Sequence, residues 1–213
     1  GGGKSTVALM DLFQRAITQE PFNDVRRTKF IILRNTIAQL RATIKPLIDQ
    51  WFVTMTKGTM GQWRLSENVF EARFVLPDKT IVHSEFCMLA ADTPDDVRRL
   101  LSLECSAAWV EECREIDPDV FAGLQGRVNR FPARIAGGVT YPGVICSTNP
   151  PPVAGFWHGL MTKPTRVLRF SCSPLRCWMT TRSIRTPKIW RTWHRTTTTT
   201  CSRERPRTGS GFT

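Results

Sequence analysis

The chain has 213 residues, 41% of them hydrophobic, and a formal net charge of +12. This length is sufficient for one sizeable domain with its own core, and no apolar run of about 18 residues indicates a membrane-spanning helix. Residues 166–213 hold eleven Lys or Arg and one Glu, whereas residues 1–165 hold nineteen bases and seventeen acids. The body is therefore nearly neutral, and any inference from charge to a polyanionic partner rests on the C-terminal segment.

The seven cysteines are an odd number, which argues against complete pairing in disulfides. Four of them lie in or beside apolar segments, as small buried hydrophobic residues do: Cys87, Cys105, Cys113 and Cys146. We therefore expect a reduced protein without disulfides, in a cytoplasmic environment.

The chain opens on a glycine-rich motif made of Gly1, Gly2, Gly3, Lys4, Ser5 and Thr6. It fits the end of the Walker A pattern G-x-x-x-x-G-K-S/T, in which backbone N–H groups and a helix N-terminus bind phosphates. Lys4 would reach the β- and γ-phosphates, and the Ser5 hydroxyl would ligate Mg²⁺. The first glycine of the pattern would precede Gly1, so we expect a fragment cut inside its loop. The alternative is a flexible start before an ordinary amphipathic helix.

Apolar runs and helical spacings alternate along the first 160 residues. The predicted elements are a helix over 5–19, a buried strand over 29–33, a helix over 36–52, a β-hairpin with strands over 70–76 and 80–86, a short helix capped by Thr93, a strand over 107–112, a helix over 117–127 and a strand over 143–150. This alternation predicts an α/β fold, a three-layer sandwich with a mainly parallel sheet. The glycine-rich motif indicates that it is a P-loop fold, and we expect its first strand, which would precede the loop, to be missing. We place this partial domain at 1–164 and a basic, disordered or irregular tail at 165–213.

Two adjacent acids, Glu111 and Glu112, end the apolar strand that begins at Ala107. A phosphate-binding loop needs such a partner: one acid positions Mg²⁺ and the next polarises the attacking water. Neighbouring residues of a strand face opposite sides, but a turn at the carboxyl end can bring both toward the nucleotide. Glu111 is longer than the usual aspartate at the metal position. The alternative is a strand that ends in surface carboxylates.

Small polar residues, Ser147, Thr148 and Asn149, end the last predicted strand. Ligands of open parallel sheets gather at the carboxyl ends of the strands. A polar side chain there could sense the γ-phosphate and transmit its loss. The alternative is a plain strand exit before Pro150.

These three pieces, in this order and spacing, resemble the ATPase domain of tailed-phage terminase large subunits, the motors that package viral DNA. The match is sharpened by residues 33–41 (LRNTIAQLR), 109–116 (WVEECREI) and 145–151 (ICSTNPP). The resemblance covers roughly residues 1–164. It implies ATP as substrate and Mg²⁺ as cofactor, with Lys4 on the phosphates, Ser5 and Glu111 at the metal, Glu112 as the catalytic glutamate and 147–149 as the coupling element.

The same resemblance implies a homo-oligomeric ring in the parent protein, acting in the host cytoplasm without a membrane. Its partners would be double-stranded DNA, the portal protein and the small terminase subunit. A nuclease domain would lie further along such a chain, and its acidic metal cluster has no counterpart after residue 164. Since part of the loop is missing, we expect this chain to hydrolyse ATP poorly or not at all.

Three arginines are candidates for an arginine finger, a group that accelerates phosphoryl transfer by about 10³–10⁵. They are Arg34, Arg127 and Arg130, and each could reach a neighbouring subunit. Solvated or structural roles are the alternative for all three.

The tail has five consecutive threonines, from Thr196 to Thr200, and almost no acid, a composition that forms cores poorly. A back-translation of residues 184–200 shifted by one nucleotide can be read as an acidic, aromatic segment of the kind expected after the coupling motif. We therefore predict that residues 166–213 are out of frame. A genuine basic arm that binds DNA phosphates is the competing interpretation.

Two other functions stay open. One is a different P-loop enzyme acting on nucleic acid, such as a helicase-type ATPase, although no helicase motif follows the third strand. The other is a non-enzymatic nucleic-acid binder acting through its basic tail.

Overall fold

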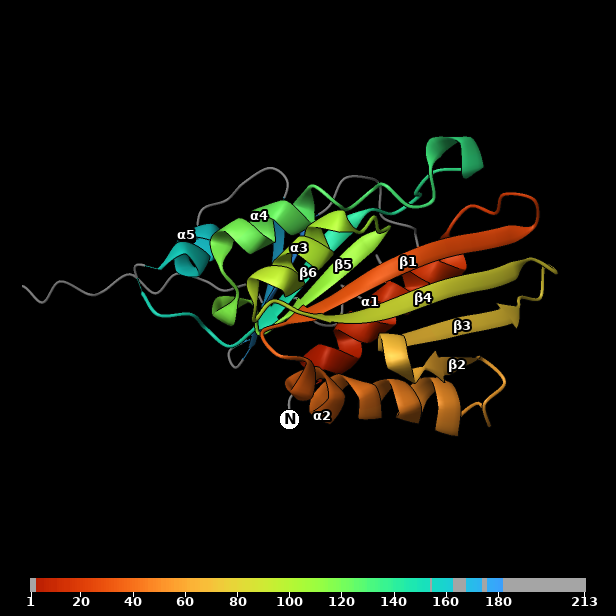
Figure 1. The fold of residues 1–213 in the computed structure, drawn as a ribbon, viewed down its shortest axis with the longest axis horizontal. Helices are drawn as coiled ribbons and strands as arrows, with labels where there is room; N and C mark the ends of the chain where they lie inside the picture. Colours follow the sequence, from red (N-terminus) through yellow and green to blue (C-terminus); the bar gives the residue numbers. More distant parts are fainter. Residues whose placement is uncertain (1–2, 154, 163–167, 174–175, 182–213) are drawn as a thin grey trace, which may run out of the picture.

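The structure, a computed structural model, describes residues 3–153, 155–162, 168–173 and 176–181. One eight-stranded sheet runs through it, with strands in the order β2-β3-β4-β1-β5-β6-β8-β7. The strands are β1 (Val25–Arg34), β2 (Gly61–Arg64), β3 (Val69–Val75), β4 (Ile81–Ala90), β5 (Ala107–Glu111), β6 (Gly143–Thr148), β7 (Leu168–Ser173) and β8 (Arg176–Thr181). Helices lie on both faces of the sheet (Figure 1).

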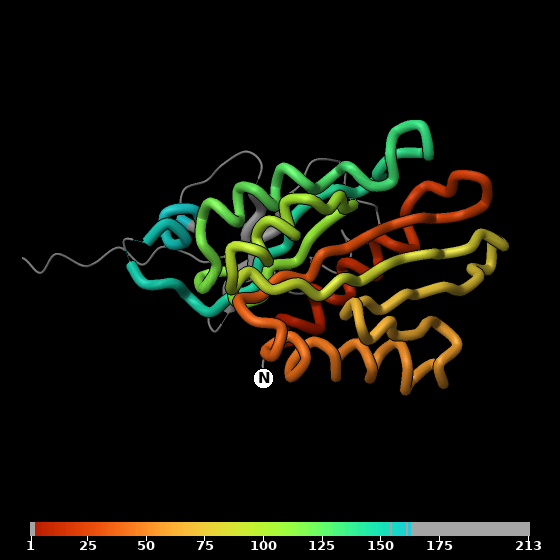
Figure 2. The backbone as a smooth tube through the Cα atoms, viewed as in Figure 1, coloured from red at the N-terminus to blue at the C-terminus, as the bar shows by residue number. Residues whose placement is uncertain are grey.

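The four central strands, β4, β1, β5 and β6, are parallel. Their carboxyl ends therefore lie at one edge of the sheet, on the left in Figure 2. The strands β2 and β3 add an antiparallel pair beside β4, and β8 joins β6 antiparallel on the other side. The α/β class and the parallel centre are confirmed. Any strand before residue 1 stays a prediction.

Two helices, α1 (Lys4–Thr18) and α2 (Ile37–Ile48), cover one face of the sheet, and α3 (Pro94–Ser102), α4 (Pro118–Gln125) and α5 (Phe156–Thr162) lie on the other (Figure 1). Strand β1 contributes side chains to both hydrophobic cores, because successive side chains of a strand point to opposite faces of the sheet. Phe30 and Ile32 belong to the core under α1 and α2, whereas Ile31 and Leu33 belong to the core under α3 and α4. The three-layer arrangement follows from this alternation.

The helix starts follow local sequence signals. Thr36 and Thr93 each accept a hydrogen bond from the backbone of the third helical residue, which returns its own side chain to the cap. Such capping boxes satisfy backbone donors that a helix start leaves free. The helix predicted over 36–52 divides into α2 and a π-helical segment, Asp49–Thr54. Short 3-10 turns follow at Leu65–Glu67, Cys113–Glu115 and Arg134–Ala136.

Three strands were not predicted. Strand β2 has only four residues and buries mainly Trp63 against the core, so its alternation is too short to stand out. Strands β7 and β8 form a hairpin within the segment for which no regular element was expected. The rest of that segment, 165–167, 174–175 and 182–213, lies outside the described residues, and the frame-shift hypothesis remains a prediction. None of the helices in the described ranges combines the length and apolar character that crossing a membrane requires.

Candidate functional site

The first described residues form the start of α1 at the carboxyl edge of the sheet. Gly3 has a φ of 69°, in the left-handed region, which glycine adopts without steric cost. Helix α1 begins immediately after it, and the first N–H groups of a helix lack partners within the helix and attract anions. Gly1 and Gly2 lie outside the described residues, and Thr6 lies half-buried in the first turn of α1.

The Lys4 ammonium joins α1 to two strand ends. Its Nζ donates a hydrogen bond to Oδ1 of Asn149 at 2.8 Å and lies 3.4 Å from Oε1 of Glu112. The Lys4 and Glu112 side chains are only 13% and 15% exposed. The ammonium is therefore held by oxygen atoms in a partly desolvated position, where its charge is weakly screened.

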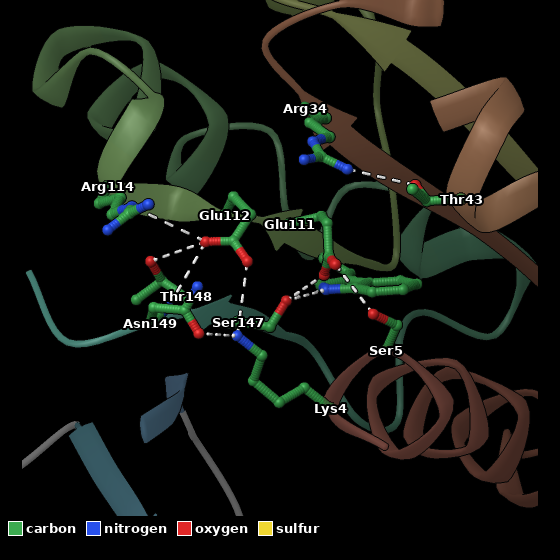
Figure 3. Close-up of polar contacts among 11 residues, drawn as sticks. Lys4, Ser5, Arg34, Thr43, Glu111, Glu112, Arg114, Ser147, Thr148 and Asn149 are labelled. Carbon is green, nitrogen blue, oxygen red and sulfur yellow. Dashed lines mark hydrogen bonds and ion pairs between the residues drawn. The ribbon is translucent and has the colours of Figure 1, made fainter. Parts of the chain in front are cut away.

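The Glu111 carboxylate is fixed from two sides (Figure 3). Ser5 Oγ donates to Oε1 of Glu111 at 2.8 Å, and the Ser147 hydroxyl donates to Oε2. The indole Nε1 of Trp109, itself fully buried, donates to Ser147 Oγ at 2.9 Å. Glu111 is 6% exposed, so this chain of hydrogen bonds determines where its carboxylate points.

Glu112 adopts a left-handed backbone, with φ 49° and ψ 53°. This conformation costs a non-glycine residue about 1–3 kcal/mol and turns the chain sharply after β5. As a result both acids reach the same edge, as the sequence predicted for a turn at the strand end. Thr148 Oγ1 and the Asn149 backbone N–H donate to Oε2 of Glu112 at 3.3 and 3.4 Å.

The residues present fit a hard cation. Mg²⁺ prefers oxygen ligands and keeps several waters, and Ser5 Oγ and Glu111 Oε1 converge to 2.8 Å. No cluster of three or more His, Cys, Asp or Glu side chains that could hold a metal ion occurs in the described ranges. A cation here would therefore depend on this pair, on water and on oxygens of a bound ligand.

One thiol beside the site, that of Cys146, has a raised pKa. Burial, followed by the contact with Cys113, raises the pKa of Cys146 well above its usual value. Cys113 follows Glu112 and Cys146 precedes Ser147, and both are fully buried. Because the thiolate is the reactive form of cysteine, the raised pKa argues against Cys146 as a nucleophile, and both residues pack behind the site.

The structure separates the three arginines. Backbone bonds tie Arg127 and Arg130 to Cys105, which precedes the amino end of β5, opposite to the site. Arg34 ends β1 at the same edge as Glu111 and Glu112. Two residues at the site, Trp109 and Arg114, were not identified from the sequence. A signal existed for Trp109, because a buried tryptophan usually finds a partner for its N–H. The Nε of Arg114 lies 3.9 Å from Oε2 of Glu112.

No family model and no curated protein sequence matches the chain. Among solved structures, the fold is similar to the large terminase of a thermophilic bacteriophage. Crystal form 2 of that terminase aligns with a TM-score of 0.48 and 13% identity, over 62% of this chain and 29% of the terminase chain. Crystal form 3, a complex with ADP, aligns with a TM-score of 0.47 and 14% identity over the same shares. The alignment thus spans under a third of the terminase length, and at such values the likeness says nothing about substrate or activity.

Proposed function

We propose that the carboxyl edge of this sheet binds a nucleoside triphosphate with Mg²⁺ and that the reaction it serves is ATP hydrolysis. The observation that carries the proposal is the meeting of the start of α1 with the end of β5. Lys4 lies 3.4 Å from Glu112, and Ser5 lies 2.8 Å from Glu111. A helix N-terminus, an ammonium, a hydroxyl and two carboxylates are the groups that phosphoryl transfer requires.

In this proposal Lys4 exchanges one of its two contacts, with Asn149 or with Glu112, for phosphate oxygens. A lysine ammonium has three donors and can keep one protein partner while it binds phosphate. The start of α1 adds partial positive charge and free N–H groups beside it. Together they would position the phosphates against the end of β5.

Ser5 and Glu111 would hold Mg²⁺. When bound, the ion offsets the charge of the phosphate oxygens and orients them for in-line displacement. The hydrogen bond from Ser147 keeps one Glu111 oxygen engaged and leaves the other facing Ser5. Trp109 acts through Ser147 and is a positioning residue.

Glu112 would orient the attacking water and accept its proton. Its Oε2 takes contacts from Thr148 and Asn149, and its Oε1 faces Lys4. Asn149 therefore contacts both the lysine and the glutamate, through its side chain and its backbone N–H. This double contact supports a coupling role for 147–149, because a change at the phosphate end would alter both.

We further propose that the chain is part of the ATPase domain of a phage terminase large subunit, working as a ring on double-stranded DNA in the host cytoplasm. The portal protein and the small terminase subunit would be its partners. This assignment is supported by the motif resemblance of residues 33–41, 109–116 and 145–151. Reconstitution with a procapsid and linear DNA would test it.

The nucleotide proposal is tested by equilibrium binding of a fluorescent ATP analogue with Mg²⁺ to the wild type and to Lys4→Ala. We expect the variant to bind about 10- to 100-fold more weakly, the loss typical of one charged hydrogen bond. Lys57→Asn is the control, since Lys57 is exposed in a left-handed turn that asparagine tolerates. Equal affinity of Lys4→Ala and wild type would refute the proposal.

A further inference from the structure

Arg34 occupies a defined place in the row of side chains at the carboxyl edge. Leu33 of β1 is paired with Val110 of β5, and Glu111 is paired with Ser147 of β6. Arg34 is therefore level with Glu111 and Ser147. Its side chain follows Ile32 onto the face covered by α1, the face that Trp109 and Glu111 also use.

The Arg34 guanidinium is poorly satisfied where it lies. Its Nε is buried and has no hydrogen-bond partner among the described residues. Its NH1 donates to Thr43 Oγ1 of α2 at 3.2 Å, while the Thr43 hydroxyl itself donates to Gln39. A guanidinium has five donors, and leaving a buried donor unpaired is unfavourable. Acceptors supplied by a ligand would remove this cost.

The neighbouring carboxylates do not use Arg34. Glu111 takes hydrogen bonds from Ser5 and Ser147, and Glu112 lies near Lys4 and Arg114. In the view of Figure 3, Arg34 and Lys4 lie on opposite sides of the two glutamates. A polyanion bound beside those glutamates would have Lys4 on one side and, on the other, a planar cation whose Nε has no partner among the described residues.

The geometry points to Arg34 as a catalytic residue of this same subunit that binds the terminal phosphate of the triphosphate. When the triphosphate binds, its guanidinium leaves Thr43 and takes oxygens of that phosphate. Its planar fork suits two phosphate oxygens at once, and its charge stabilises the charge that develops during transfer. This role rests on the proposed function and replaces the expectation that Arg34 reaches a neighbouring subunit.

The test compares the dissociation constants of ADP and of the non-hydrolysable ATP analogue AMP-PNP, both with Mg²⁺, for wild type, Arg34→Ala and Arg34→Lys. The terminal phosphate is present only in AMP-PNP. We expect Arg34→Ala to weaken AMP-PNP binding by about 10-fold or more and to leave ADP binding within about twofold. Arg34→Lys keeps the charge without the fork, and we expect an intermediate loss. A purely structural arginine would weaken both ligands equally, and that result would overturn the inference, as would unchanged AMP-PNP affinity.

Two controls isolate the contact. Arg41→Ala removes an exposed arginine of α2 that contacts Asn68, and we expect both affinities to stay unchanged. Thr43→Val removes the present partner of Arg34 without removing the cation, and AMP-PNP should bind as well as or better than to wild type. If Thr43→Val weakened AMP-PNP binding as much as Arg34→Ala does, the inference would be overturned. If Arg34→Ala does not fold, Arg34→Lys and Thr43→Val carry the comparison. Failure of wild type to bind either nucleotide would refute the proposed function, and the inference with it.

Discussion

Ser5 Oγ donates a 2.8 Å hydrogen bond to Oε1 of Glu111, across 106 positions of sequence. The contact joins the first turn of α1 to the last residue of β5, because α1 packs under β1, β5 and β6. Each of the two side chains has an oxygen directed at the other, and each adjoins a second polar residue, Lys4 or Glu112. A hydroxyl and a buried carboxylate so placed form the oxygen pair on which a bound magnesium ion would depend.

Glu112→Gln should separate binding from chemistry. The amide keeps the size of the side chain and its contacts with Thr148 and Asn149, but it cannot accept a proton from water. We expect nucleotide affinity within a few-fold of wild type and a single-turnover rate of phosphate release lower by about 10²–10⁴. Radiolabelled ATP makes slow release measurable. A rate unaffected by the substitution would exclude Glu112 as the group that activates water.

The left-handed backbone at Glu112 leads to a second prediction, which concerns the free energy of unfolding. Because its φ is 49°, glycine should suit this position better than alanine, and Glu112→Gly should unfold with a free energy about 1 kcal/mol higher than Glu112→Ala. At Glu115, an exposed residue of the following 3-10 turn, the order should reverse. Urea denaturation of the four variants measures this. The same order at both positions would contradict a strained Glu112.

Trp109→Phe should misplace Glu111 through Ser147. The substitution removes the indole N–H that donates to Ser147 Oγ, and we expect a loss of about 1–3 kcal/mol in the free energy of unfolding. We also expect the magnesium concentration needed for nucleotide binding to rise. The matched control is Trp63→Phe, which removes the indole bond to Asp49 far along the sheet. A shift in magnesium dependence with Trp63→Phe as large as with Trp109→Phe would argue against a specific path through Ser147.

Because the Cys87 and Cys105 thiols are buried, we predict that they are alkylated slowly and that the protein loses stability at alkaline pH. Burial raises the pKa of Cys87 and of Cys105 from 9.0 to about 12. Since the folded state binds these protons more tightly, their contribution to stability is complete below pH 9 and is lost as the pH rises toward 12. At pH 8 we expect iodoacetamide to modify both thiols far more slowly in the native than in the urea-unfolded protein. Peptide mass spectrometry would show this, and equal rates would mean that the β4 and β5 core opens readily.

Much of this fold was predictable because its signals are local. The apolar alternation of β3 and β4, the cap at Thr93 and the apolar run of β5 each specify an element without help from the rest of the chain. The site residues Lys4, Ser5, Glu111 and Glu112 were also identified from sequence, because the loop and the acid pair are short motifs with a fixed chemistry. Their roles remain predictions.

Other features depend on tertiary contacts that no local pattern encodes. The bond from Trp109 to Ser147 requires the pairing of β5 with β6, and the distance of Arg127 and Arg130 from the site follows from the turn after α4. The length of β1, ten residues rather than the predicted five, reflects pairing of Val25 to Arg34 with β4 along its whole length. Charged residues at its amino end hide that pairing from a reading based on hydrophobicity.

The most direct test of a magnesium-nucleotide site is electron paramagnetic resonance of Mn²⁺, which takes the same oxygen ligands, in the presence of AMP-PNP. We predict that the wild type forms a ternary complex, and that Ser5→Ala and Glu111→Gln each weaken Mn²⁺ binding by about 10-fold or more. If Mn²⁺ bound equally well to the wild type and to both variants in the presence of the nucleotide, this result would contradict a magnesium site at Ser5 and Glu111.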